Sequence, residues 1–298
     1  MLHICTIHWK NSNWVDIQLE YLNKFITVPY QVYTLYSGFE MNEQQIQGFF
    51  SCCSTDEVSH PAKLNKLTGK VNRNDPNDYL LFLDNDCFPV ADISYLLDKL
   101  EEYPLIAIQR KELNGQPTPH PSFCLTTVGF WNSLNVGWGV GAKPYKDDQG
   151  QDVKDTGTAL YWKLVEEKIK WLPLHRTSGL TDHPVLFSIY DGTIYHHGAG
   201  SRPARTRWDL IQEDPQKQIE INTKQSKTIL DRLKNKMDVF SEAGTFETRV
   251  EADLHKPLKA VKQPDLTEAK KMVFKDAPKK KTKIRKRSSK TKKPKESE

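Results

Sequence analysis

The sequence predicts an α/β fold in which helices flank a mainly parallel central sheet. Two observations lead to this prediction. Strand-like apolar segments alternate with segments of helical periodicity over residues 1–212, which is the order of elements in parallel βαβ units. The segment 79–83 is also continuously apolar, and such runs are typical of strands that are buried on both faces.

The N-terminal residues contain the clearest strand–helix–strand unit. A strand is predicted over 3–8, and a second strand over 30–36 ends at a Ser-Gly pair. Between them we expect a helix with Ser12 or Asn13 at its N-cap, because both residue types are preferred there. Apolar residues that recur every three or four positions define the inward face of this helix, namely Val15, Leu19, Leu22 and Ile26.

Periodicity and capping residues predict the later elements as well. A short helix is expected over 61–67, and another, capped by Asp92, follows Pro89. The sequence Asp155-Thr156-Gly157 opens a further helix. Additional strands are expected over 105–109, 122–130, 171–174 and 185–197.

The chain divides into three parts by composition. Residues 1–212 carry the α/β pattern and form the predicted main domain. Residues 213–264 are predicted to form a helical extension. Residues 265–298 read as a disordered tail rich in Lys and Arg. The apolar residues expected on one face of the extension are Ile229, Leu233, Met237 and Phe240.

The positive charge of the chain is concentrated at its C-terminal end. Residues 277–298 contain eleven Lys or Arg and two Glu, a net charge of +9. Because the whole chain carries +5, residues 1–276 carry −4. The basic character therefore belongs to the tail, and we expect any attraction to nucleic acid or to an anionic membrane surface to act through it.

The cysteines and the absence of long apolar runs predict a cytoplasmic location. The five cysteines are odd in number and lack metal-binding spacing. Adjacent Cys52 and Cys53 cannot readily bridge each other, so a reduced intracellular protein is expected. The N-terminal segment is too short and polar for a signal peptide, and no apolar run is long enough for a membrane span.

Two carboxylates follow the buried strand directly. Asp84 and Asp86 flank Asn85, and Pro89 lies just beyond. Because proline cannot donate to a sheet ladder, we expect the strand to stop near the acids. The carboxyl edge of a parallel sheet is where α/β proteins hold ligands, and paired carboxylates there suit a divalent cation that carries a phosphorylated ligand. The alternative is a solvated turn after a core strand.

A second segment brings two adjacent histidines to a glycine-rich turn. His196 and His197 end a predicted strand, and Arg202, Arg205 and Arg207 follow the turn. Successive strand residues point to opposite faces, so one histidine should face the site and the other should face packing or solvent. Glycines let backbone N–H groups approach a phosphate, and arginines neutralise it. The alternative is a core histidine pair beside a surface basic turn.

These two segments resemble motifs of GT-A glycosyltransferases. Asp84-Asn85-Asp86 resembles the DxD motif, and the segment 197–203 is similar to the histidine–glycine–basic–proline segment that completes the metal and diphosphate site in some of those enzymes. It is one residue shorter than the HxxGxxKP form of glycogenin-like enzymes, and retention or inversion of configuration stays open. The resemblance covers about residues 1–210. It implies a GT-A-like catalytic domain that moves a sugar from a nucleotide-sugar to a glycan, a protein or a lipid-linked acceptor.

The resemblance also implies roles for individual residues. Asp86 would bind Mn²⁺ or Mg²⁺ directly, with His197 or His196 as a nitrogen ligand, and Asp84 would contact the ribose or a metal-bound water. The implied metal ligands are drawn from Asp84, Asp86, His196 and His197. The implied contacts of the nucleotide-sugar are Thr6, His8, Trp9, Asp84, Asn85 and Arg202. For the first three of these, a plain strand end is an equally good interpretation.

Asp155 is the candidate general base. At a helix N-terminus the helix dipole would stabilise its anion, and in an inverting mechanism it would take the proton of the acceptor hydroxyl. A simple N-cap is the alternative. Sugars stack on aromatic rings, so His120, Trp131 and Trp138 are candidates for an acceptor groove, although such aromatics are more often core residues.

Two other functions stay open from the sequence. A nucleotidyltransferase would make nucleotide-sugars on the same fold, but those enzymes usually carry a glycine-rich loop after the first strand, and residues 8–12 contain no glycine. A polyanion-binding protein would act through the cations of 279–295, which lack interleaved aromatic residues and so suit electrostatic attachment without base reading.

Overall fold

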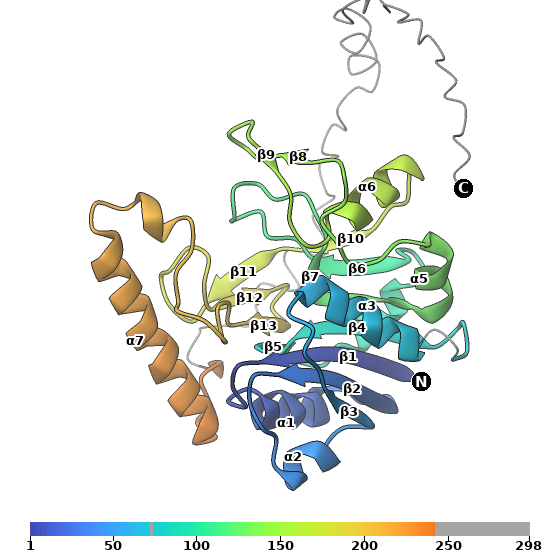
Figure 1. Cartoon of the computed structure of the whole chain (residues 1–298), viewed down its shortest axis with the longest axis horizontal. Coiled ribbons are helices and arrows are strands. Elements are labelled where there is room, and N and C mark those ends of the chain that lie inside the picture. The colour runs from blue at the N-terminus through green and yellow to red at the C-terminus, as the bar shows by residue number, and fades with distance from the viewer. Residues whose placement is uncertain (72–73, 242–298) are drawn as a thin grey trace, which may run out of the picture. The chain divides into compact units, whose positions relative to one another are not determined.

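The centre of the fold is a seven-stranded sheet, seen in a computed structural model that describes residues 1–71 and 74–241 (Figure 1). All of these residues belong to one compact unit. From edge to edge the strands are β3 (Ser51–Ser54), β2 (Tyr30–Ser37), β1 (Leu2–Trp9), β4 (Tyr79–Asp84), β7 (His120–Thr127), β6 (Leu105–Ile108) and β10 (Leu172–Leu174). Only β7 runs antiparallel to its neighbours. The predicted mainly parallel central sheet is confirmed.

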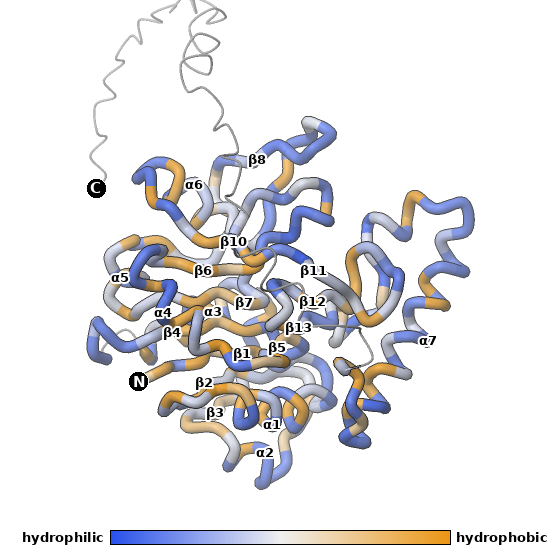
Figure 2. The backbone as a smooth tube through the Cα atoms, turned by 180° about the vertical axis from the view of Figure 1, so that it is seen from behind, coloured by the Kyte–Doolittle hydropathy of each residue, from blue (hydrophilic) through white to orange (hydrophobic). Residues whose placement is uncertain are grey.

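Helices cover both faces of this sheet, and the central strand β4 is therefore buried on both sides. Leu81 and Leu83 pack into one hydrophobic cluster, whereas Leu80 and Phe82 pack into another. This double burial explains the uninterrupted apolar run in the sequence. The first cluster includes residues of α1 (Val15–Phe25) and α4 (Ser94–Lys99), and the second includes residues of α3 (His60–Val71), α5 (Val128–Leu134) and α6 (Thr158–Glu166). Figure 2 shows hydrophobic residues concentrated along the sheet.

A smaller antiparallel sheet begins directly after the acidic turn. Its strands are β5 (Cys87–Pro89), β13 (Ile194–His196), β12 (Ser188–Tyr190) and β11 (Arg176–Gly179). Pro89 therefore ends β5, and the acid-bearing strand β4 ends earlier, at Asp84. The pairing of β5 with β13 sets His196 opposite Cys87, which brings the two motif segments of the sequence together. A separate hairpin consists of β8 (Tyr145–Lys146) and β9 (Asp152–Val153), and the short α2 spans Glu43–Gln47.

Several predicted element boundaries are wrong. The strand expected over 122–130 ends at Thr127, whose hydroxyl accepts a hydrogen bond from the Phe130 N–H and caps α5. The N-cap of α1 is Trp14, which makes no side-chain cap. Helix α6 has Gly157 at its N-cap, with a φ of 95°, a conformation that glycine tolerates better than other residues. Asp155 thus lies in the turn before the helix.

The helix α7 (Pro215–Lys234) follows the short 3₁₀ helix η1 (Asp209–Ile211). Ile229 and Leu233 pack into a third cluster that also contains Trp14 and Phe88. The helix ends at Lys234, so the predicted apolar face extended too far: Met237 is half exposed, and Phe240 is buried beyond the helix. Residues 242–298, with the rest of the predicted extension and the basic tail, lie outside the described residues.

Two further sequence predictions concern cysteines and membrane spans. All five cysteines are free in the structure, and Cys5, Cys87 and Cys124 are buried. Among the described residues no helix combines the length and the apolar character that a membrane span requires. Cytoplasmic location stays a prediction.

Candidate functional site

The acidic turn between β4 and β5 is held in place by α1. Gln18 donates hydrogen bonds from Nε2 to the backbone carbonyls of Asp84 and Cys87, each at 2.8 Å. The Thr6 hydroxyl in turn donates to Gln18 Oε1 at 2.9 Å. Thr6 is fully buried, so its hydroxyl orients Gln18. The predicted nucleotide contact at Thr6 thus lies in the framework under the turn.

The glycine-rich segment after β13 clamps the same turn from the other side. The Asp86 carbonyl accepts from the His197 N–H at 2.9 Å, and Asp86 Oδ2 accepts from the Gly200 N–H at 2.8 Å. Asn85 donates to the Ser201 hydroxyl at 2.9 Å. A Cβ on Gly200 would stand 2.6 Å from both Asp86 Cβ and Trp14 Nε1. Only glycine fits here, because the backbone must approach the carboxylate closely.

Two carboxylates and one imidazole converge at this point. One ligand atom each of Asp84, Asp86 and His196 lies within 4.8 Å of the others. His196 Nε2 is 3.9 Å from Asp84 Oδ2 and 3.7 Å from Asp86 Oδ1. These distances exceed a hydrogen bond, but they match the roughly 3–4 Å that separates two ligands each about 2.1 Å from one small divalent ion. The donor set therefore fits a Mn²⁺ or Mg²⁺ ion.

The protonation state of His196 suits such a role. Burial lowers its pKa, and nearby Asp86 opposes that shift without cancelling it. The imidazole is therefore neutral near pH 7, which is the form that binds metals.

His197 faces away from the carboxylates. Its Nδ1 pairs with the Tyr195 hydroxyl and its Nε2 with the Ser226 hydroxyl, both at 2.8 Å. Its ring also packs against Trp14. Burial lowers the pKa of His197 to about 3. The structure thus brings His196 to the two acids, and it buries His197 between the small sheet and α7.

Two further histidines surround Asp84 that sequence reasoning did not place there. His60, the first residue of α3, sets Nε2 2.9 Å from Asp84 Oδ1. The ring centroid of His120 is 5.9 Å from that of His196. No local signal marks His60, because only the packing of α3 beside β4 brings it to the acid. For His120 the sequence predicts a different place, in an acceptor groove.

These histidines control the charge on Asp84. Burial alone would raise the pKa of Asp84, but the combined effect of His60, His120 and His196 outweighs burial, and the pKa falls well below its ordinary value. Burial also lowers the pKa of His60, yet the pair with Asp84 reverses this, and the pKa of His60 is raised overall. Asp84 is therefore an anion at any pH near neutral.

The remaining predicted nucleotide contacts lie at the end of β1. His8 is fully buried and packs edge-on against Phe49. Trp9 is 39% exposed, and Lys10 Nζ lies 4.1 Å from its ring centroid. Of the two side chains, Trp9 is exposed to solvent and His8 is not.

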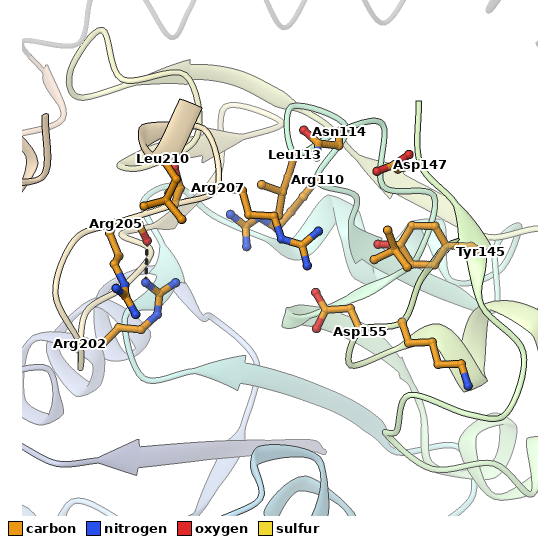
Figure 3. A pocket seen from close by; sticks show the side chains of 13 residues that line it. Arg110, Leu113, Asn114, Tyr145, Asp147, Asp155, Arg202, Arg205, Arg207 and Leu210 are labelled. Atoms are coloured by element: carbon orange, nitrogen blue, oxygen red, sulfur yellow. Dashed lines mark hydrogen bonds between the residues drawn. The ribbon is translucent and has the colours of Figure 1, made fainter. Parts of the chain in front are cut away.

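A pocket of about 450 Å³ contains Asp155, and Arg202, which follows the glycine-rich segment, also lines it (Figure 3). Asp155 Oδ1 accepts from the Thr156 N–H at 2.7 Å. In Figure 3 its carboxylate faces the pocket across from Arg202 and Arg205. Burial lowers the pKa of Arg202, an effect that Asp86 opposes and Arg110 reinforces. Arg202 thus connects the pocket electrostatically with the acidic turn.

The two tryptophans suggested for an acceptor groove are core residues, which corrects that expectation. Trp131 and Trp138 are 5% and 2% exposed. Their ring centroids lie 4.7 and 5.2 Å from that of Phe82 on β4. They cover one face of the sheet and leave no ring surface for a sugar.

Comparisons with known proteins add little beyond this geometry. No protein-family model matches the chain. No curated protein matches it. Solved structures with some likeness include S. aureus TarS, with 12% identity and a TM-score of 0.37 over 55% of this chain and 33% of that chain. A structure of S. aureus TarS 1-349 has 12% identity and a TM-score of 0.39 over 85% of this chain and 76% of that chain. The glycosyltransferase GlyE of Streptococcus pneumoniae has 13% identity and a TM-score of 0.32 over 45% of this chain and 36% of that chain. Mouse xyloside xylosyltransferase 1 has 10% identity and a TM-score of 0.30 over 44% of this chain and 68% of that chain.

The extent of these likenesses is small. The chain covers about a third of the length of the full TarS and GlyE chains. At these identities and TM-scores the solved structures assign no activity to this chain.

Proposed function

We propose that this protein is a glycosyltransferase that moves a sugar from a nucleotide-sugar to an acceptor hydroxyl, with a divalent cation held by Asp84, Asp86 and His196. The observation that carries this proposal is the convergence of those three side chains at the carboxyl end of a central strand. A ligand binds at such an edge in α/β folds. The resemblance of the acidic turn to a DxD motif supports the same proposal.

Each ligand has a defined support from the chain. The Gly200 N–H fixes Asp86 Oδ2, which leaves Oδ1 on the side of His196. Gln18 fixes the backbone on both sides of the turn. A Mn²⁺ or Mg²⁺ ion held by these three residues would act as a Lewis acid and stabilise the charge that grows on the leaving diphosphate.

Asp155 and Arg202 are the proposed groups around the reacting atoms. The acceptor oxygen forms a bond to the anomeric carbon, and the bond from that carbon to the diphosphate oxygen breaks, with its electron pair leaving on the diphosphate. Asp155 takes the acceptor proton in an inverting reaction. Arg202 neutralises part of the diphosphate charge, and Trp9 is the proposed stacking surface for the base.

A thermal-shift screen of nucleoside diphosphates, with and without Mn²⁺, tests this proposal. A nucleotide that binds only the metal-loaded protein raises the melting temperature only when both are present. We expect Asp86→Asn to abolish that rise and Asp98→Asn, an exposed carboxylate on α4, to preserve it. A rise that needs no metal, or that survives Asp86→Asn, would contradict the proposal.

A direct assay follows with the nucleotide-sugars of the base that stabilises the protein. Slow metal-dependent hydrolysis of one donor, with release of the nucleoside diphosphate, is the expected result. Release of pyrophosphate from a nucleoside triphosphate and a sugar phosphate would instead support nucleotidyl transfer.

A further inference from the structure

The pocket that contains Asp155 is unusually cationic. Five cationic and two acidic side chains line it. The cations come from three separate segments: Arg110 follows β6, Lys154 follows β9, and the others follow β13. The lining charges are Arg110, Lys154, Arg202, Arg205 and Arg207, against Asp147 and Asp155. Segments far apart in the sequence have thus placed like charges around one volume, which is unfavourable unless an anion enters it.

The arginines of this pocket have guanidinium groups available to a ligand. Within residues 1–71 and 74–241, Arg110, Arg205 and Arg207 form no side-chain hydrogen bond or ion pair with a carboxylate, and Arg110 Nε is buried without a hydrogen-bond partner. Among the same described residues, Arg202 donates only to backbone carbonyls, those of Pro203 and Arg205. Figure 3 shows the guanidinium groups of the pocket directed toward the same space as the Asp155 carboxylate.

The charge exceeds what the donor requires. In the proposed function, the metal and Arg202 serve the diphosphate of the nucleotide-sugar. Four cations then remain against two carboxylates. This surplus matches a phosphate ester, which carries about 1.5 to 2 negative charges at neutral pH, better than it matches a single carboxylate. Arginine forks also bind phosphate oxygens two at a time.

We infer that the acceptor carries a phosphate group, which Arg110, Arg205 and Arg207 bind beside Asp155. This inference rests on the proposed function and specifies its acceptor. The arginines position the acceptor so that one of its hydroxyls meets the Asp155 carboxylate, and the phosphate itself takes no part in bond making. The pocket has room for a phosphorylated sugar-sized molecule at about 450 Å³.

Calorimetric titration of glucose 6-phosphate into the full-length protein tests this inference. The protein is first saturated with Mn²⁺ and the nucleoside diphosphate that the thermal-shift screen identifies, so that the donor site is filled. We expect glucose 6-phosphate to bind this complex, and glucose and glucuronate to bind at least about tenfold more weakly. Inorganic phosphate should bind more weakly than the ester, because it lacks the sugar hydroxyls.

Charge-removing variants assign the site. Arg205→Gln and Arg207→Gln are each expected to weaken glucose 6-phosphate binding by about tenfold, the effect of one lost hydrogen bond to a charged group. Both side chains are exposed, so folding should be preserved, and an unchanged melting temperature checks this. Lys66→Gln, an exposed cation on α3, is the matched control and should bind like the wild type.

The outcomes separate this inference from the proposed function. If the metal-dependent nucleotide binds but glucose 6-phosphate does not, or if Arg205→Gln and Arg207→Gln bind it normally, the inference is wrong and the proposed function stands. Displacement of the nucleotide by glucose 6-phosphate, or equal affinity for inorganic phosphate or glucuronate, would likewise overturn the phosphorylated acceptor. Failure of the nucleotide itself to bind would overturn the proposed function first.

Discussion

The substitution Gly200→Ala perturbs the acidic turn through a single added methyl group. The new Cβ would lie 2.6 Å from Asp86 Cβ, 2.6 Å from Trp14 Nε1 and 2.7 Å from Asp86 Oδ2. Real Cβ atoms essentially never come this close, so either the carboxylate and the indole move away or the glycine-rich segment does. In both cases the hydrogen bonds of Gly200 to Asp86 and to Trp14 are stretched or lost.

The expected cost follows from these contacts. Overpacking a well-packed site costs about 1–3 kcal/mol, and a weakened hydrogen bond to a charged group costs up to about 1.5–3 kcal/mol. Because partial movement relieves some of each, we expect the free energy of unfolding to fall by about 2–4 kcal/mol. In either case Asp86 Oδ2 loses the hydrogen bond that fixes its carboxylate beside His196, so Mn²⁺ affinity should fall at least about tenfold.

Urea unfolding and Mn²⁺ titration measure the two effects separately. Gly139→Ala is the matched control, because its added Cβ would meet nothing within 4 Å and its backbone is not in the left-handed region. We expect that control to unfold and bind like the wild type. The close approach of Gly200 to Asp86 would be refuted if Gly200→Ala matched Gly139→Ala in both measurements.

Three further predictions test other parts of the account. Burial lowers the pKa of His8 to about 3, so protonation of His8 in the unfolded chain should lower the free energy of unfolding as the pH falls below about 6.5, by about 2 kcal/mol at pH 5. In urea titrations at pH 7 and pH 5, the His8→Gln variant should lack this contribution of about 2 kcal/mol to the pH dependence. If the variant shows the same difference in free energy of unfolding between the two pH values as the wild type, the prediction is wrong. Gln18→Leu leaves the Asp84 and Cys87 carbonyls without their donor. It should lower the free energy of unfolding by about 1–3 kcal/mol and weaken Mn²⁺ binding. Unchanged metal affinity would contradict the role of Gln18 as the support of the turn. Trp138→Ala should lower the free energy of unfolding by about 3–5 kcal/mol, because it leaves a cavity in the core. Loss of acceptor binding with no loss of stability would instead show that Trp138 lines an acceptor groove.

The central sheet could be predicted because its signal is local. The run 79–83 is apolar at every position since β4 is covered on both faces, and the acids that follow it are adjacent in sequence. The alternation of a strand also predicted that His196 and His197 point in opposite directions. Which of them meets the acids could not be predicted, because that depends on the register of β13 against β5.

The rest of the site depends on contacts between distant segments. His60 reaches Asp84 only through the packing of α3. The arginines of the pocket lie about 45 to 52 residues away from Asp155 in the sequence, and only the fold brings them to it. The sequence also could not place Trp138 correctly. A large aromatic residue near a polar loop has the same local sequence whether it lines a groove or packs on Phe82. Asp155 resembled an N-cap, but Gly157 takes that position.

Electron paramagnetic resonance of Mn²⁺ measures directly whether the three converging side chains hold an ion. In a titration of the full-length protein, we expect one bound Mn²⁺ per chain with the wild type and with Asp98→Asn, and loss of that bound ion with Asp86→Asn and with His196→Gln. If the His196→Gln and Asp86→Asn variants retain the wild-type stoichiometry and affinity, or if the wild type binds none even with the nucleotide present, no such metal centre exists.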